Sequence, residues 1–272
     1  MAVNLFIELS IIIVIAVLVS VLMRLLRQPL IIGYIFTGVL LSPYFLNFIK
    51  STDSIFVFSQ IGVALLLFIV GLSLSPNVIK EVGKVSLITG LGQIIFTSFV
   101  GFIFGILLGF STIASLYIAI AMTLSSTIII MKLLSDKNDL GKLYAKISVG
   151  FLFVQDIVAI LLLIFISSFS EGVNLAELAL KTFFGGILTV VFLIIFSKKV
   201  LPKLSSFFAK SLEFLFLFAI GWGLGIATFF DFIGFSLEVG ALVAGIALAA
   251  TPYNYEISSK MRPLRDFFII LF

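Results

Sequence analysis

Long apolar runs, separated by short polar segments along nearly the whole chain, constrain this sequence more than any motif in it. A helix that crosses ~30 Å of hydrocarbon needs roughly 20 apolar residues. Nine runs approach or exceed that length, over residues 5–23, 30–48, 55–75, 85–109, 112–134, 147–169, 178–197, 211–230 and 235–251. A tenth begins near Leu264 and stops at Phe272, so either further sequence completes it or it lies in the membrane interface. We therefore expect an all-α, polytopic membrane protein with nine complete transmembrane helices and part of a tenth.

The composition argues against most enzymes. Of the 272 residues, 62% are hydrophobic and only 11% are charged. The sequence has no Cys and no His, so it lacks a thiol nucleophile, an imidazole base and the soft ligands of zinc, iron–sulfur and haem sites. We expect neither enzymatic activity nor a cofactor. The net charge of +4 is better explained by membrane topology than by a nucleic-acid partner.

Basic residues alternate between loops in a way that predicts the orientation of the chain. The loops after the first, third, fifth, seventh and ninth runs hold 15 of the 17 Lys and Arg residues. Only Lys50 and Lys181 lie on the other side. Lys and Arg accumulate in cytoplasmic loops, so we predict a multi-pass protein of the cell membrane whose N-terminus lies outside the cytoplasm.

Two segments of the chain are similar to each other, 32-IGYIFTGVLLSPY-44 and 239-VGALVAGIALAATPY-253. Each has two glycines five positions apart and then a Pro-Tyr pair. The corresponding glycines are Gly33 with Gly240 and Gly38 with Gly245. Small residues at such spacing also occur wherever membrane helices pack closely, which is the alternative explanation.

The position of these segments favours an internal repeat. An odd number of crossings separates them, so the two copies would have opposite orientations in the membrane, as in the inverted repeats of many secondary transporters. We predict a first repeat of six helices over residues 1–169, a connector helix at 178–197 and an incomplete second repeat over 211–272.

One acidic residue lies deep in an apolar run. Asp156 is about ten residues into the run 147–169, beside Gln155 and among apolar neighbours. An ionisable group at a helix centre costs about 2.5–3.5 kcal/mol on insertion scales and usually has a function. Glu238 is intermediate in depth, and the other acidic residues lie near helix ends or in loops. The alternative, a structural partner for a Lys, is weakened because no Lys or Arg lies at full depth.

A group of hydroxyl side chains lies halfway along the run 112–134. It consists of Thr123, Ser125, Ser126 and Thr127. Such side chains can satisfy backbone groups where a helix unwinds, and their oxygens can bind a small hard cation. Ser and Thr also join membrane helices to one another, so this signal gains weight only beside a buried carboxylate.

A single buried carboxyl can bind a proton and a cation in turn. Removal from water favours the protonated form, whereas a bound cation favours the ionised form. A site that holds either H⁺ or a monovalent cation, and that opens to one side at a time, gives obligatory exchange. Because one charge replaces another, we predict electroneutral antiport.

Five segments resemble one known family: 62-GVALLLFIVGLSLSP-76, 124-LSSTIII-130, 154-VQDIVAILLL-163, 239-VGALVAGIAL-248 and 256-EISSKMRPLRDFFIILF-272. The chain resembles the monovalent cation:proton antiporter-2 family, and within it the Kef-type potassium efflux and KefB-like Na⁺/K⁺:H⁺ exchanger group. This resemblance covers essentially the whole chain. It implies a sodium/hydrogen exchanger-like transmembrane domain over 1–272 with the inverted-repeat antiporter fold.

The resemblance also implies roles for individual residues. Asp156 with Gln155 would bind the monovalent cation and the proton, and a crossing helix would break at Ser125, Ser126 and Thr127. Gln-Asp members tend towards K⁺ and electroneutral exchange, and Asn-Asp members towards Na⁺. The resemblance implies a homodimer in the lipid bilayer, joined through a scaffold that includes helices one, two, eight and nine. Helices five and six would belong to a mobile core.

Other interpretations stay open at this point. Family members usually have about 12 or 13 helices, and their second broken helix would follow residue 272. The chain is then either a fragment of a longer antiporter or a truncated membrane subunit that does not transport alone. A ligand-gated K⁺ efflux channel is another alternative. Hydroxyl and carboxylate oxygens suit both K⁺ and Na⁺, so the residues themselves leave the choice of ion open.

Overall fold

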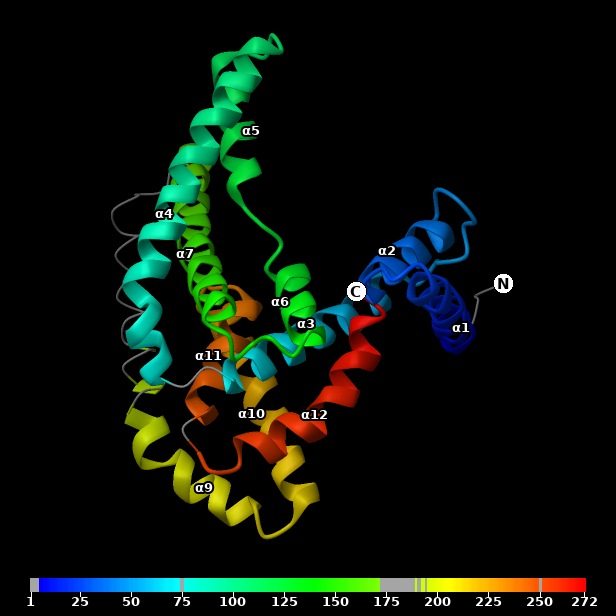
Figure 1. Ribbon diagram of the computed structural model, residues 1–272, viewed down its shortest axis with the longest axis vertical. Coiled ribbons are helices and arrows are strands. Elements are labelled where there is room, and N and C mark those ends of the chain that lie inside the picture. Colours follow the sequence, from blue (N-terminus) through cyan, green and yellow to red (C-terminus); the bar gives the residue numbers. More distant parts are fainter. Residues whose placement is uncertain (1–4, 74–75, 172–188, 190–191, 194, 250) are drawn as a thin grey trace.

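The computed structural model describes residues 5–73, 76–171, 189, 192–193, 195–249 and 251–272, and every regular element in these residues is a helix. Figure 1 shows their arrangement. The helices are α1 (Leu5–Leu25), α2 (Leu30–Leu41), α3 (Thr52–Leu72), α4 (Pro76–Leu107), α5 (Thr112–Thr123), α6 (Thr127–Asp136), α7 (Leu143–Glu171), α9 (Leu201–Phe208), α10 (Leu212–Phe232), α11 (Leu237–Ala249) and α12 (Asn254–Ile269).

Five stretches of the described chain are long and apolar enough to cross a membrane. They are Leu5–Leu25, Thr52–Leu72, Val82–Leu107, Thr112–Asp136 and Leu212–Phe232. Helices α2 and α11 are apolar but shorter. An all-helical chain with these spans is consistent with a polytopic membrane protein. Most of the predicted connector run 178–197 lies outside the described residues, so the count of nine complete spans stays a prediction.

Several predicted boundaries were wrong for local reasons. Helix α2 ends at Leu41 and not near residue 48, because Ser42 precedes Pro43 and adopts ψ 156°. A residue before proline disfavours the helical conformation. Helix α4 begins earlier than predicted, with Pro76 at its first position, where a proline is well tolerated. The short helix α9 lies in a stretch where the apolar runs predict no helix.

The last helix was also predicted wrongly. Helix α12 begins at Asn254, ten residues before the predicted start at Leu264. It is amphipathic, with Ile257, Met261 and Ile269 buried and Glu256, Lys260 and Arg262 exposed. A search for continuous apolar runs misses such a helix, because its apolar positions recur with the helical period instead of following one another.

One group of helices surrounds α3. Helices α11, α12 and α10 all pack against it, and we call these four the α3 bundle. The helices come close because glycines line their contacts. A Cβ atom on Gly245 of α11 would overlap the carbonyl oxygen of Phe68 in α3. A Cβ atom on Gly62 of α3 would lie 2.7 Å from the backbone of Phe268 in α12.

A second group consists of α4, α5 and α7, with α5 and α7 both packed on α4. We call it the α4 bundle, and it forms the elongated upper part of Figure 1. Helix α6 leaves this bundle and packs against α3. One hydrophobic cluster contains Val70 of α3, Met131 of α6 and Leu152 of α7. The segment from α5 to α6 thus passes from one bundle to the other.

The four glycines of the predicted repeat have unequal surroundings. Gly33 packs α2 on α1, and a Cβ atom there would lie 3.1 Å from the Met23 side chain. Gly240 packs α11 on α10, and a Cβ atom there would lie 2.7 Å from Phe230. These two occupy comparable helix contacts. Gly245 lies tightly against α3, whereas a Cβ at Gly38 would meet nothing within 4 Å. The assignment of two repeats therefore stays a prediction.

Candidate cation site

A break interrupts the run 112–134, which the apolar pattern alone would make a single helix. Helix α5 ends at Thr123 and α6 begins at Thr127. Between them Leu124 has φ −81° and ψ 117°, and Ser126 has φ −72° and ψ 100°. The Oγ atom of Ser126 accepts a hydrogen bond from the backbone N–H of Ile129 and caps α6. The break lies where the family resemblance implied one.

The break frees backbone groups at the point where the chain leaves the α4 bundle. The last carbonyls of α5 and the first N–H groups of α6 lose their helical partners, and the two half-helix ends carry opposite partial charges. The Thr123 carbonyl oxygen at the end of α5 accepts two side-chain hydrogen bonds. Gln155 Nε2 donates to it at 3.2 Å and Gln93 Nε2 at 3.3 Å.

Gln155 is positioned by α7 and almost fully buried, with 2% of its surface exposed. Besides the bond to Thr123, its Nε2 donates to Oε1 of Gln93 in α4. Its own Oε1 is buried and has no hydrogen-bond partner in the described part of the chain. The two amides and the freed carbonyl therefore form a polar cluster inside an otherwise apolar bundle.

Gln93 was not predicted from the sequence. It lies in the run 85–109, and its Nε2 also donates to Thr97 Oγ1 at 3.1 Å. The signal was present, because Gln93 is an amide within an apolar run, just as Gln155 is. Ionisable groups and hydroxyls carried the prediction of the site from the residues, and Gln155 entered it beside Asp156 through the family resemblance, which gave no role to Gln93.

Asp156 faces a different environment from its neighbour. Consecutive residues of a helix point about 100° apart, so Asp156 does not reach the cluster at Thr123 as Gln155 does. It is partly buried and makes no hydrogen bond or ion pair with any described residue. The Glu238 side chain, in the first turn of α11, interacts electrostatically with it. Asp156 of the α4 bundle thus lies within electrostatic range of the α3 bundle.

The hydroxyl side chains that were predicted to bind the cation do not join the cluster formed by the two glutamine amides and the Thr123 carbonyl. Ser125 and Ser126 are exposed and Thr127 is partly buried. Thr123 is buried, but its hydroxyl donates to the carbonyl of Ile120 at 2.7 Å. The structure therefore joins Gln155 to the end of α5, while, among the described residues, Ser125, Ser126 and Thr127 make no hydrogen bond with Gln155 or Asp156.

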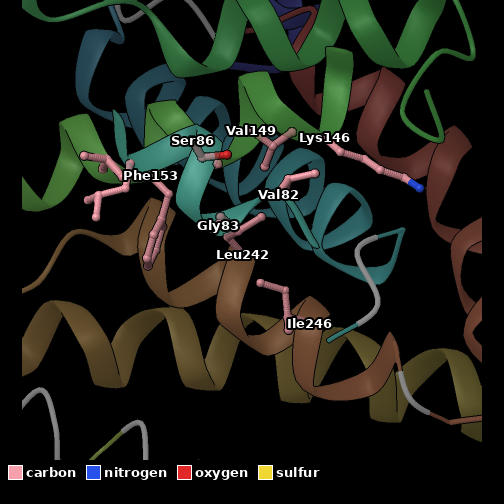
Figure 2. A pocket seen from close by; sticks show the side chains of 11 residues that line it. Val82, Gly83, Ser86, Lys146, Val149, Phe153, Leu242 and Ile246 are labelled. Carbon is pink, nitrogen blue, oxygen red and sulfur yellow. The ribbon is translucent and has the colours of Figure 1, made fainter. Parts of the chain in front are cut away.

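A cavity of about 290 Å³ lies between α4 and α7 on one side and α11 on the other (Figure 2). Its lining is mainly apolar, and Phe153 on it lies one helical turn before Asp156. The hydroxyl of Ser86 and the side chain of Lys146 are its polar parts. The lining residues are Val82, Gly83, Ser86, Leu87, Lys146, Val149, Gly150, Phe153, Val154, Leu242 and Ile246.

The cavity lies beside the N-terminal parts of α4 and α7, where these helices face α11. Gly150 permits close packing of α7 on α4, since a Cβ there would overlap the Ser86 hydroxyl. Lys146 and Val82 adjoin loops that the charge pattern predicts to be cytoplasmic. Within the described residues no group of three or more acidic side chains lies together that could hold a metal ion.

Comparison with known proteins identifies the family of this chain. Residues 11–272 match the family described as sodium/hydrogen exchanger, transmembrane. The chain belongs to this family. Membership in the monovalent cation:proton antiporters, which the sequence motifs suggested, is thereby confirmed.

Relatives within the exchanger family carry names that refer to different ions. The chain is 30% identical over 276 residues to K(+) efflux antiporter 5 of Arabidopsis thaliana, covering 97% of the chain and 48% of that relative. It is 27% identical to the probable Na(+)/H(+) antiporter GerT of Bacillus cereus, covering 88% of the chain and 64% of GerT. It is 23% identical to the iron transporter MagA of Paramagnetospirillum magneticum, with 94% and 59% covered. The chain spans about half the length of the plant antiporter.

Proposed function

We propose that this exchanger-family chain carries the ion site of an antiporter that exchanges a monovalent cation for H⁺ across the membrane. The observation that carries the proposal is the broken helix α5–α6, whose freed Thr123 carbonyl is bonded to Gln155, the residue before Asp156. Half-helix ends near the middle of the membrane are typical of the ion sites of secondary transporters. No resident cofactor is needed for this chemistry.

Asp156 would bind the cation and the proton alternately. It has no basic partner among the described residues, so its negative charge is available to a transported ion. A cation at the carboxylate displaces the proton, and a proton neutralises the carboxylate and releases the cation. Exchange of one monovalent cation for one proton on a single carboxyl is electroneutral.

We further propose that K⁺ is preferred over Na⁺. The Gln-Asp pair at 155–156 supports K⁺ through the family resemblance, and the plant relatives are named K(+) efflux antiporters. GerT is named for Na⁺, so the measurement must compare both ions. Oxygen ligands accept either ion, and the geometry of the ligands decides between them.

The division into two bundles supports alternating access. The cavity lies between α4 and α7 of one bundle and α11 of the other, one turn from Asp156. A movement of the α4 bundle against the α3 bundle would change the side from which Asp156 is reached. In this proposal the cavity belongs to the cytoplasmic pathway, the N-terminus lies outside the cytoplasm, and two copies associate in the membrane as a homodimer.

The test is transport by the complete gene product in proteoliposomes. A pH-sensitive dye inside the vesicles records proton movement when KCl, NaCl or choline chloride is added outside. We expect K⁺ to move protons faster than Na⁺, and Asp156→Asn to lower the response to background. Asp231→Asn, the same substitution at an exposed residue near the end of α10, is the matched control and should transport normally.

The outcomes separate the competing functions. Normal exchange by Asp156→Asn overturns the site. Cation flux that does not depend on an imposed pH gradient indicates a channel. A wild-type rate that changes when the membrane potential is clamped contradicts electroneutral exchange, since an electroneutral cycle moves no net charge.

A further inference from the structure

The amide of Gln155 uses its hydrogens and leaves its oxygen free. Nε2 donates to Oε1 of Gln93 and to the carbonyl of Thr123. Oε1 is buried without a partner among the described residues. A buried polar atom left unpaired costs about 1–3 kcal/mol. This oxygen can therefore accept a hydrogen bond or bind a cation.

Gln93 determines which end of the Gln155 amide is free. A flipped Gln155 amide would bring its oxygen against two acceptors, the Gln93 Oε1 and the Thr123 carbonyl. Gln93 is itself held, because its Nε2 donates to Thr97 Oγ1 and to Thr123 O. The hydrogens of the two amides are thus directed at Thr97, Thr123 and Gln93, and the one unpaired amide atom is Oε1 of Gln155.

We propose that Gln93 is a positioning residue of the cation site, which holds the Gln155 amide so that its oxygen is a fixed ligand for a dehydrated monovalent cation. The inference rests on the proposed function, in which Asp156 binds the transported ion, and on the cation-binding role of Gln155 that the family resemblance implies. An oxygen that is held in place cannot follow a smaller ion as a mobile side chain can, and ligand geometry contributes to selection between K⁺ and Na⁺. Gln93 in α4 then affects ion affinity and selectivity without touching the ion.

A purely structural role is the competing explanation. Gln93 also satisfies the freed carbonyl of Thr123, and loss of that bond could disturb the end of α5 in any state of the protein. The two roles differ in one respect. A positioning residue acts through Gln155, so its effect must disappear when Gln155 has no amide.

The experiment measures the apparent KM for K⁺ and Na⁺ in proteoliposomes, and the rise in melting temperature that KCl produces over choline chloride in detergent. Gln93→Met replaces the amide with an apolar side chain of similar size. We expect it to raise the apparent KM for K⁺ about tenfold, the effect of one lost interaction of about 1.4 kcal/mol, with little change in kcat. The KCl-induced stabilisation should fall in parallel. Thr97→Val, which removes one bond of Gln93 but leaves its contact with Gln155, should retain the wild-type KM.

A double-mutant cycle separates positioning from structure. Gln155→Met should raise the KM by itself, and Gln93→Met should add nothing in that background. An equal fold-change in both backgrounds overturns the inference. Should Gln93→Met fail to fold, Gln93→Asn serves instead, because it keeps an amide on a side chain too short to hold Gln155 in the same place.

Failure of this inference is distinct from failure of the proposed function. A wild-type KM in both Gln93 variants, with exchange still lost in Asp156→Asn, overturns the role of Gln93 alone. A wild-type protein that neither exchanges ions nor is stabilised by K⁺ or Na⁺ overturns both. If the protein binds K⁺ but does not exchange it, the rise in melting temperature that KCl produces still measures the effect of Gln93→Met on cation binding.

Discussion

Lys132 of α6 and Asp266 of α12 form an ion pair between the broken helix and the α3 bundle, with Nζ 3.1 Å from Oδ1. Lys132 is 3% exposed and also pairs with Asp136, one turn further along α6, at 2.8 Å. Arg265 strengthens the same contact by donating to Ser135 Oγ at 2.6 Å. The second half of the broken helix is therefore tied to the α3 bundle by charged groups, while its first half packs on α4.

The two carboxylates should compensate for each other in stability. Asp136→Asn leaves Lys132 paired with Asp266, so it should cost about 1 kcal/mol or less. Asp266→Asn leaves Lys132 paired with Asp136 but also removes the carboxylate beside the buried Arg265, so it should cost more. The double variant leaves a buried ammonium without a carboxylate partner, and breaking a buried pair in this way costs about 3–5 kcal/mol. Thermal unfolding of purified protein in detergent measures all three. Small, additive losses would contradict the ion-pair network.

Helix packing gives a second prediction, with a control in the glycines themselves. Gly245→Ala places a Cβ against the backbone oxygen of Phe68, which has little room to move. Such overpacking costs about 1–3 kcal/mol, so the melting temperature should fall. Gly38→Ala meets nothing within 4 Å and gains helix propensity, so it should be neutral or slightly stabilising. Equal effects of the two substitutions would contradict the close contact of α3 and α11.

The sequence predicted the long elements better than their interruptions. Apolar runs of membrane-spanning length placed α1, α3 and α10 within about three residues of their ends, because hydrocarbon thickness sets both the length and the composition of such helices. The start of helix α12 was predicted wrongly because this helix is amphipathic and does not form a continuous apolar run. Its Asp266 pairs with Lys132 from a position 134 residues away, and no local pattern in the sequence reports such a contact.

The candidate site was predictable in part. Asp156 stands out by its depth in an apolar run, and the predicted role of Gln155 beside it came from the family resemblance. The break after Thr123 came from the family resemblance, since hydroxyl residues also occur in unbroken membrane helices. Gln93 could not be linked to Gln155 from the sequence, because the link depends on how α4 packs against α7. The packing of the helices, and not the local sequence, determines which hydrogen-bond donors lie near a freed carbonyl.

The serines of the break should have separable roles. Ser126→Ala removes the cap of α6 and should cost about 1 kcal/mol of stability, seen as a lower melting temperature. Ser125 makes no hydrogen bond with any described residue, so Ser125→Ala should leave the melting temperature unchanged. If Ser125 contributes an oxygen to the cation site, the same variant raises the KM for K⁺. Destabilisation by Ser125→Ala instead of Ser126→Ala would contradict the capping geometry.

The loop between α6 and α7 gives a pH-dependent prediction. The Lys142 side chain, 2.7 Å from Asp139, lowers the pKa of the Asp139 carboxyl, and the Tyr144 hydroxyl that donates to it adds to this effect. A depressed pKa means that the native state favours the carboxylate. Its stabilising contribution is therefore complete above the unfolded pKa of about 3.9 and is lost as the pH falls through the lower, folded value.

Asp139→Asn should consequently lower the melting temperature by a small, constant amount between neutral pH and about pH 5, and by progressively less below about pH 4. The effect is small because the Lys142 side chain is 60% exposed to solvent, and ion pairs that reach the solvent contribute little and are screened by salt. Lys142→Met removes the main cause of the depressed pKa, so Asp139→Asn should have a weaker effect in that background at every pH. A difference between wild type and Asp139→Asn that grows as the pH falls would have the wrong sign for a stabilised carboxylate and would contradict the contact.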